Sequence, residues 1–230
     1  MSFVQKGKGK DLLLLHGYLS NKESFSAQIA YFSRFYRVTA LDFLGFGDSA
    51  PLPFAFSVDD YADWLLQCLQ TLGVHRPHVI AHSFGCRVAV KLASRDNGVF
   101  DKILLTGPAG VILPRSVRYY CKVWGYKLLK RIAPKFVKGR FGSEEYRSLS
   151  PLMQQSFVKI VNEDLRKCAR QVRNEVLIVQ GMDDSVTTNA QALAYLKSFP
   201  NARIEYIEGG HFAFSENPIV FCLQAEEFFL

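Results

Sequence analysis

The chain has 230 residues, a length that fits one α/β domain or two very small ones. Hydrophobic residues make up 49% and charged residues 21%, which excludes an intrinsically disordered, collagen-like or disulfide-stapled miniature protein. The net charge is +7, but no apolar run reaches the roughly 18 residues of a membrane span, and no signal peptide is expected.

Strand and helix patterns alternate along both ends of the chain. Short apolar runs predict buried strands at residues 11–16, 36–41, 77–82, 101–106, 176–180 and 203–207. Helical patterns are expected at residues 21–32, 57–72, 84–95, 189–199 and 218–230. Strands separated by helices imply right-handed crossovers, so the sequence predicts an α/β fold with a mostly parallel sheet flanked by helices.

The middle of the chain, residues 108–173, lacks this alternation. Helical patterns at 119–132 and 150–168 predict a helical insertion into a core domain formed by residues 1–107 and 174–230. Residues 111–173 hold 15 Lys and Arg against four Asp and Glu, a net charge of +11. The rest of the chain holds 13 basic and 17 acidic residues, a net charge of −4. The insertion is therefore chemically distinct from the core.

Three interpretations of this basic insertion stay open. The charges could form a solvated face above an apolar roof. They could attract an anionic or carrier-bound substrate, or make weak contact with an anionic membrane surface through the alternating basic and apolar residues of 115–131. Nucleic acid is excluded as a partner, since no recognition motif accompanies the charge. The sequence does not predict an oligomeric state.

The five cysteines are widely spaced and form no CxxC pair. This pattern predicts reduced thiols in a cytoplasmic protein rather than a disulfide framework or a zinc site. Neither a metal nor an organic cofactor is expected.

The first candidate catalytic residue is Ser83, at the junction of a predicted strand and a predicted helix. A nucleophile at such a sharp turn needs small residues two positions before and after it, and Ala81 and Gly85 meet that need. The turn exposes the hydroxyl, and the start of the helix supplies partial positive charge. Ser83 is therefore the expected nucleophile.

A serine hydroxyl needs a general base, and the chain has five histidines. His211 lies between the last predicted strand and the last predicted helix, at the sheet edge where open α/β sheets build their sites. His75 and His78 lie at the opposite edge, and His16 and His82 precede tight turns, where hydrogen bonding within loops is expected. His211 is therefore the expected base.

The base needs an acid that fixes its tautomer and stabilises the imidazolium. Two candidates, Asp183 and Asp184, follow the strand at 176–180, and either could turn inward. Asp184 is preferred. The order serine, aspartate, histidine along the chain then fits a known arrangement of the triad.

Backbone amides are expected to bind the oxyanion of the tetrahedral intermediate. The amide of Phe84 follows the nucleophile, and the amide of Tyr18 lies in the loop after the first buried strand. Asp42 and Ser49 belong to a turn-rich segment whose expected role is structural, as hydrogen-bonding residues of a tight loop beside the site.

Together these motifs resemble those of the α/β-hydrolase family over nearly the whole chain. The motifs are His16-Gly17-Tyr18, Asp42-x-x-Gly45-x-Gly47-x-Ser49, His82-Ser83-Phe84-Gly85, Gly181-x-x-Asp184 and Gly210-His211-Phe212. The resemblance implies a catalytic triad of Ser83, Asp184 and His211, oxyanion donors at Tyr18 and Phe84, and a helical cap (lid) formed by the insertion. It also implies about seven strands rather than eight, because only residues 1–5 are available for the β-hairpin that usually precedes the first buried strand. Cys86 departs from the family's usual glycine, and packing against the sheet is its expected role.

The expected activity is that of a carboxylesterase-like serine hydrolase, which cleaves a small to medium acyl substrate through an acyl-enzyme on Ser83. An alternative keeps the triad but cleaves a carbon–carbon bond in an anionic keto-acid. The segment from Ser83 to Arg87 is similar to that of lyases with this fold. A remote alternative is a binding protein without catalytic activity on the same fold.

Overall fold

In a computed structural model, which describes residues 1–114, 146 and 149–230, the core is a seven-stranded sheet. Its strands are β1 (Ser2–Lys6), β2 (Asp11–Leu15), β3 (Arg37–Asp42), β4 (His78–His82), β5 (Ile103–Thr106), β6 (Val176–Gly181) and β7 (Ala202–Ile207). Their order across the sheet is β1-β3-β2-β4-β5-β6-β7. Only β1 runs antiparallel to its neighbour, and every other pair is parallel. The predicted fold class and strand number are confirmed.

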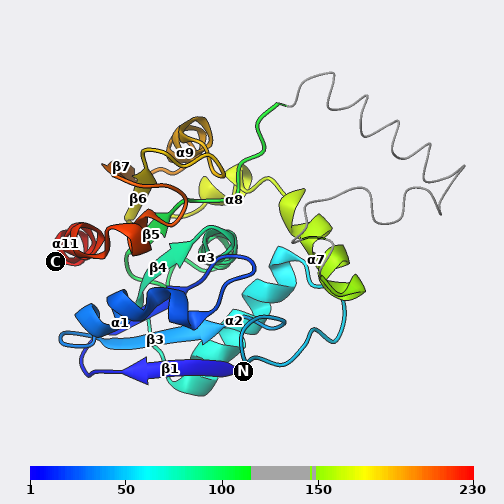
Figure 1. The fold of residues 1–230 in the computed structure, drawn as a ribbon, viewed down its shortest axis with the longest axis horizontal. Helices are drawn as coiled ribbons and strands as arrows, with labels where there is room; N and C mark the ends of the chain where they lie inside the picture. Colours follow the sequence, from blue (N-terminus) through cyan, green and yellow to red (C-terminus); the bar gives the residue numbers. More distant parts are fainter. Residues whose placement is uncertain (115–145, 147–148) are drawn as a thin grey trace, which may run out of the picture.

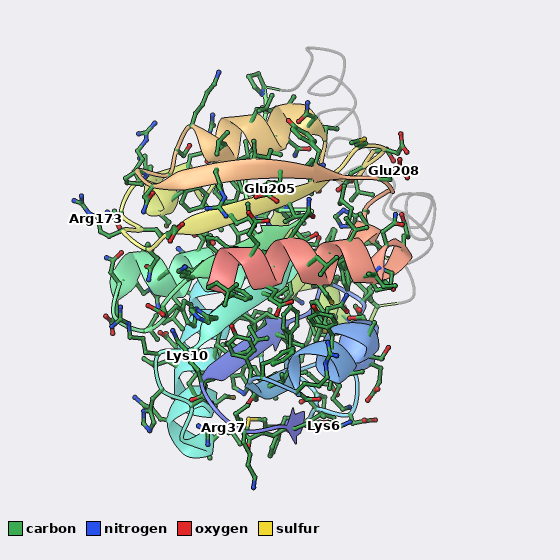
Figure 2. All side chains as sticks on the ribbon, turned by 90° about the vertical axis from the view of Figure 1, so that its left-hand side faces the viewer. Lys6, Lys10, Arg37, Arg173, Glu205 and Glu208 are labelled. Carbon is green, nitrogen blue, oxygen red and sulfur yellow. The ribbon has the colours of Figure 1, made fainter. Side chains whose placement is uncertain are left out.

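The central strands are buried on both faces, as their uninterrupted apolar sequences predict. In β2 all four leucines are fully buried, and successive side chains enter opposite cores: Leu13 and Leu15 one, Leu12 and Leu14 the other. Because the strands are parallel, their carboxyl ends meet at one edge of the sheet. Figure 2 shows Lys10 and Arg173, which precede β2 and β6, at one end of the molecule, and Glu208, which follows β7, at the other.

Helices cover both faces of the sheet (Figure 1). The described helices are η1 (Lys22–Phe25, a 3-10 turn), α1 (Ser26–Phe32), α2 (Val58–Leu72), α3 (Phe84–Arg95), α7 (Pro151–Val161), α8 (Arg166–Ala169), α9 (Asn189–Leu196), α10 (Ala213–Glu216) and α11 (Pro218–Phe229). One core packs α1, α10 and α11 against the sheet, and the other packs α2, α3, α8 and α9. The helix α2 begins at the predicted cap Ser57, which forms a capping box with Asp60, and ends at Gly73.

Two predicted helices differ from those observed. The pattern at 21–32 starts as the 3-10 turn η1 before α1 begins. The pattern at 150–168 breaks into α7 and α8, because the Asp164 carboxylate accepts hydrogen bonds from the amides of Ile112 and Arg166 and turns the chain between them. The predicted helix at 119–132 and the whole basic segment 115–131 lie outside the described residues.

The described part of the insertion packs directly onto the core domain. The Ser156 hydroxyl on α7 donates to the carbonyl of Phe56 at 2.7 Å, and the Lys159 amine donates to the carbonyl of Ala55 at 2.6 Å. Leu165 and Val172 are fully buried in the same core as α2 and α3. The helix α7 is thereby held beside the edge of the sheet where the predicted site lies. The boundaries of the insertion at 108 and 173 stay a prediction.

Candidate active site

Ser83 occupies a strained turn between β4 and α3. Its φ of +48° and ψ of −105° lie in a region that non-glycine residues rarely adopt, and such strain persists only where the surroundings enforce it. The turn is closely packed against the end of β2, because a Cβ atom on Gly85 would lie only 2.4 Å from the backbone oxygen of Leu15. The Ser83 side chain does not cap α3, so its hydroxyl stays available at the carboxyl edge of the sheet.

Asp184 and His211 are in direct contact. The Nδ1 atom of His211 lies 2.9 Å from Oδ2 of Asp184, whose side chain is fully buried. The other carboxylate oxygen, Oδ1, accepts the amides of Val186 at 2.8 Å and Thr187 at 2.9 Å. Burial alone would raise the pKa of Asp184, but the hydrogen bonds from His211 and Thr187 lower it to about 2. Asp184 therefore carries a negative charge at neutral pH, which fixes the Nδ1–H tautomer of His211 and leaves Nε2 free to accept a proton.

Asp183, the other candidate acid, is exposed to solvent. Its backbone amide donates to the carbonyl of Gly209, but the structure shows no contact between its carboxylate and His211. Of the two adjacent aspartates, Asp184 is the one that the structure brings to the histidine.

Ser83 and His211 line the same cavity, which has a volume of about 980 Å³. No direct hydrogen bond joins their side chains among the described residues. In ligand-free sites such bonds are often long and tighten when substrate binds. The predicted nucleophile, base and acid thus converge from three separate loops at one edge of the sheet.

Tyr18 and Phe84, the predicted oxyanion donors, line this cavity too. Phe84 is the first residue of α3, so its amide has no acceptor within the helix. The amide of Tyr18 makes no hydrogen bond to another described residue. Both N–H groups are therefore available to a ligand. The Tyr18 hydroxyl donates to the carbonyl of Met153 at 3.1 Å, which connects this loop to α7.

His16 and His82 are buried and take structural roles, as expected. His16 donates from Nδ1 to the carbonyl of Gly17 at 2.7 Å and accepts the amide of Phe43 at Nε2 at 3.1 Å. His82 donates from Nε2 to the backbone carbonyl of His211 at 2.9 Å, and the two rings lie 4.7 Å apart. Burial lowers the pKa of His16 to about 4 and that of His82 to about 3, so both stay neutral. Neutral His82 thus supports the loop that carries His211.

Asp42 organises the turn-rich loop beside the site, as predicted. Its carboxylate accepts the amide of Lys22 at 2.7 Å, the Lys22 amine at 2.8 Å and the amide of Asp48 at 3.0 Å. The Ser49 hydroxyl donates to the Asp42 carbonyl at 2.7 Å. A side chain on Gly47 would collide with this carboxylate, so only glycine fits there. The sequence analysis did not identify Lys22, because its partner lies 20 residues further along the chain.

Arg87 is a second residue that the sequence analysis did not place in the site. It follows Ser83 by four residues, so it lies one helical turn further along the same face of α3. The side chain lines the cavity, although the residue is only 7% exposed. Its Nη1 atom donates to the backbone carbonyl of Glu163 at 2.8 Å, and it forms no ion pair with a described carboxylate. Burial lowers the pKa of Arg87, although the nearby charges of Glu163 and Asp164 raise it in part.

A family model described as alpha/beta hydrolase fold matches residues 11–126 and 119–218. The chain belongs to the alpha/beta hydrolase family. Its sequence is similar to 2-hydroxymuconate semialdehyde hydrolase of Pseudomonas putida, with 26% identity over 97% of this chain and 88% of that protein. It is also similar to (E)-2-((N-methylformamido)methylene)succinate hydrolase of Acinetobacter baylyi, with 35% identity over 36% of this chain. That match spans only 32% of the Acinetobacter protein.

Solved structures of this family superimpose on nearly the entire alpha/beta hydrolase chain. The meta-cleavage product hydrolase of Pseudomonas fluorescens IP01 gives a TM-score of 0.75 at 22% identity, over 99% of this chain and 93% of that one. The enol-lactonase of Burkholderia xenovorans LB400 gives a TM-score of 0.77 at 20% identity, over 99% and 95%. At these identities the structures show a common fold. With its family and its hydrolase relatives, the protein is an enzyme of the hydrolase class.

Three further findings on this alpha/beta hydrolase concern its cysteines, its candidate metal ligands and the length of its helices. Cys68, Cys86, Cys168 and Cys222 are free thiols, and Cys86 is fully buried against the sheet. The described residues hold no group of three or more His, Cys, Asp or Glu side chains arranged to bind a metal ion. None of the described helices combines the length and the apolar character that crossing a bilayer requires.

Proposed function

We propose that this enzyme hydrolyses a carboxylic ester through an acyl-enzyme on Ser83, with His211 as general base and Asp184 as the acid that orients it. The observation that carries the proposal is the 2.9 Å contact between Asp184 and His211 at the rim of the cavity that Ser83 also lines. A buried carboxylate of low pKa beside an imidazole, next to a half-buried serine at a strained turn, is the arrangement that activates a hydroxyl nucleophile.

The reaction follows from these positions. His211 takes the Ser83 proton at Nε2 as the serine oxygen attacks the ester carbonyl. The amides of Tyr18 and Phe84 stabilise the oxyanion, and His211 returns the proton to the departing alcohol. Water, activated by the same imidazole, then cleaves the acyl-enzyme and releases the carboxylic acid. The charge of Asp184 stabilises the imidazolium in both halves of the reaction.

The direct test is active-site labelling with a fluorophosphonate probe, together with turnover of short-chain aryl esters. Wild-type protein should be labelled at one residue and should hydrolyse the esters, whereas Ser83→Ala should lose both activities. Ser185→Ala is a suitable control, because Ser185 is an exposed serine in the loop that carries Asp184. Labelling that persists in the Ser83 variant would show that another residue is the nucleophile.

A second candidate function is hydrolysis of a carbon–carbon bond in a carboxylate-bearing substrate, and Arg87 is the observation that favours it. A buried guanidinium in the cavity that forms no ion pair with a carboxylate of the described residues is suited to bind a substrate carboxylate. The similarity to 2-hydroxymuconate semialdehyde hydrolase over 97% of the chain points in the same direction. An anionic substrate would also agree with the basic composition of residues 111–173.

Two comparisons separate these candidates. Turnover of 2-hydroxymuconate semialdehyde without turnover of aryl esters would favour carbon–carbon cleavage. For the carboxylate site, the ratio of kcat/KM for a carboxylate-bearing ester to that for its neutral analogue should fall about tenfold or more in Arg87→Met, as expected for a lost charge-assisted hydrogen bond. In the control Arg95→Met, which removes a charge of the same helix that pairs with Asp59 and Asp63, the ratio should stay constant.

A further inference from the structure

The Thr187 hydroxyl contacts both partners of the Asp184–His211 pair. Its Oγ1 atom lies 2.7 Å from Oδ2 of Asp184 and 3.3 Å from Nδ1 of His211. The residue is only 4% exposed and lines the cavity. Three polar atoms from two loops therefore meet in one small triangle next to the proposed base.

The proton positions in this triangle follow from the charges. Asp184 is ionised and has no proton to donate, so the single Thr187 hydroxyl proton points to Oδ2 along the short contact. A lone pair of Oγ1 then faces the N–H at Nδ1 of His211. That N–H donates mainly to Oδ2 at 2.9 Å and only weakly to the hydroxyl at 3.3 Å. Oδ2 of Asp184 thus accepts hydrogen bonds from two donors, the Thr187 hydroxyl and the N–H group of His211.

The hydroxyl is not required to hold the loop. The Thr187 amide donates to Oδ1 of Asp184 at 2.9 Å, and its carbonyl accepts Nε2 of Gln180 at 2.9 Å. Both bonds come from the backbone of Thr187, and the amide of Val186 adds a third to the same loop. An isosteric side chain without a hydroxyl would leave all three in place.

We propose that Thr187 is a positioning residue, whose hydroxyl fixes the ring of His211 against Asp184. The proposal rests on the proposed function for its catalytic consequence. The hydroxyl holds Oδ2 of Asp184 through the contact at 2.7 Å. Its weaker contact with Nδ1 at 3.3 Å keeps the ring of His211 turned towards the same carboxylate oxygen.

The other titratable groups near His211 do not replace Asp184 as the partner of its ring. His82 lies against the ring but is neutral, because burial lowers its pKa to about 3. Glu216 on α10 is engaged by the amide of Gly210 at 2.6 Å. Asp184 is thus the charged group in hydrogen-bonding contact with the imidazole among the described residues.

The test compares Thr187→Val, which keeps the shape and loses the hydroxyl, with Thr187→Ser, which keeps the hydroxyl. The Nδ1–H signal of His211 in the proton NMR spectrum reports its hydrogen bond to Asp184 without any need for activity, and His211→Gln assigns the signal. In Thr187→Val this signal should move, and in Thr187→Ser it should stay near that of the wild type. With an ester substrate, kcat should fall about tenfold in the valine variant while KM changes little, and serine should restore kcat.

The outcomes separate this proposal from the proposed function. An Nδ1–H signal of His211 that is identical in Thr187→Val and wild type would overturn the role of the hydroxyl, and so would equal losses in the valine and serine variants. If Ser83 fails to react with the fluorophosphonate while the signal still moves in Thr187→Val, the proposed function is wrong and the positioning role of Thr187 stands. Urea unfolding of each variant verifies that the fold is retained.

Discussion

The substitution Asp184→Asn tests the arrangement of the site most directly, because it changes one carboxylate oxygen into an amide group. Oδ1 can keep its two bonds from the amides of Val186 and Thr187, so the loop retains its shape. The new NH₂ group, however, would face Nδ1 of His211 at 2.9 Å, where an acceptor stood before. His211 then adopts the other tautomer, with the proton on Nε2, and the ring can no longer accept the Ser83 proton.

The expected loss in kcat is about 10⁴-fold, the loss found when a triad aspartate is replaced by asparagine. This corresponds to about 5.5 kcal/mol of transition-state stabilisation. The pKa of Asp184, lowered from 3.8 to about 2, predicts an additional loss of about 2 kcal/mol in the free energy of unfolding at pH 7. The folded carboxylate is favoured above pH 3.8, so this contribution disappears as the pH falls towards 2.

The assay is ester turnover at saturating substrate, together with urea unfolding monitored by circular dichroism. Asp183→Asn is the matched control, since it makes the same chemical change at the neighbouring, exposed position. The control should retain kcat within about twofold and should lose little stability, as expected for a surface substitution. Equal losses in the two variants, or full activity in Asp184→Asn, would refute the assignment of the acid.

Two further predictions concern the stability of the fold. Gly85→Ala should destabilise the protein by about 1–3 kcal/mol or prevent folding, because its Cβ would lie 2.4 Å from a backbone oxygen at the end of β2. In the control Gly98→Ala the new Cβ meets only a surface carboxylate at 3.2 Å, so equal urea midpoints for the two variants would contradict this explanation. Acid should also destabilise the protein, because burial lowers the pKa of His16 and His78 from 6.5 to about 4 and that of His82 to about 3. Unfolding therefore takes up protons as the pH falls below 6.5, and each histidine should cost about 2 kcal/mol of stability at pH 5 relative to pH 7.5. A urea midpoint that stays constant between these two pH values would show that the histidines titrate normally in the folded state.

The sequence alone determined the elements of this fold and the identity of its most distinctive site residues. Buried parallel strands leave runs such as that of β2, in which every residue is apolar after Asp11, and surface helices leave a helical period such as that of α2. The sterics of a tight turn are also local, so Ser83 could be identified from the small residues on either side of it. The pattern at 150–168 did not predict the break between α7 and α8, where the Asp164 carboxylate binds the backbone amides of Ile112 and Arg166.

Only the tertiary structure decided which side chains meet. The sequence favoured Asp184 over its neighbour Asp183 only through the family resemblance, whereas in the structure two amides and the Thr187 hydroxyl turn Asp184 inward and leave Asp183 in solvent. Arg87 is a basic residue of an amphipathic helix in the sequence, and it becomes a buried cation of the cavity because the segment around Glu163 folds over it. The physical reason is the range of the interactions: periodicity and turn sterics act between neighbours along the chain, whereas burial and hydrogen-bond partners depend on residues that the sheet brings together from loops up to 129 positions apart.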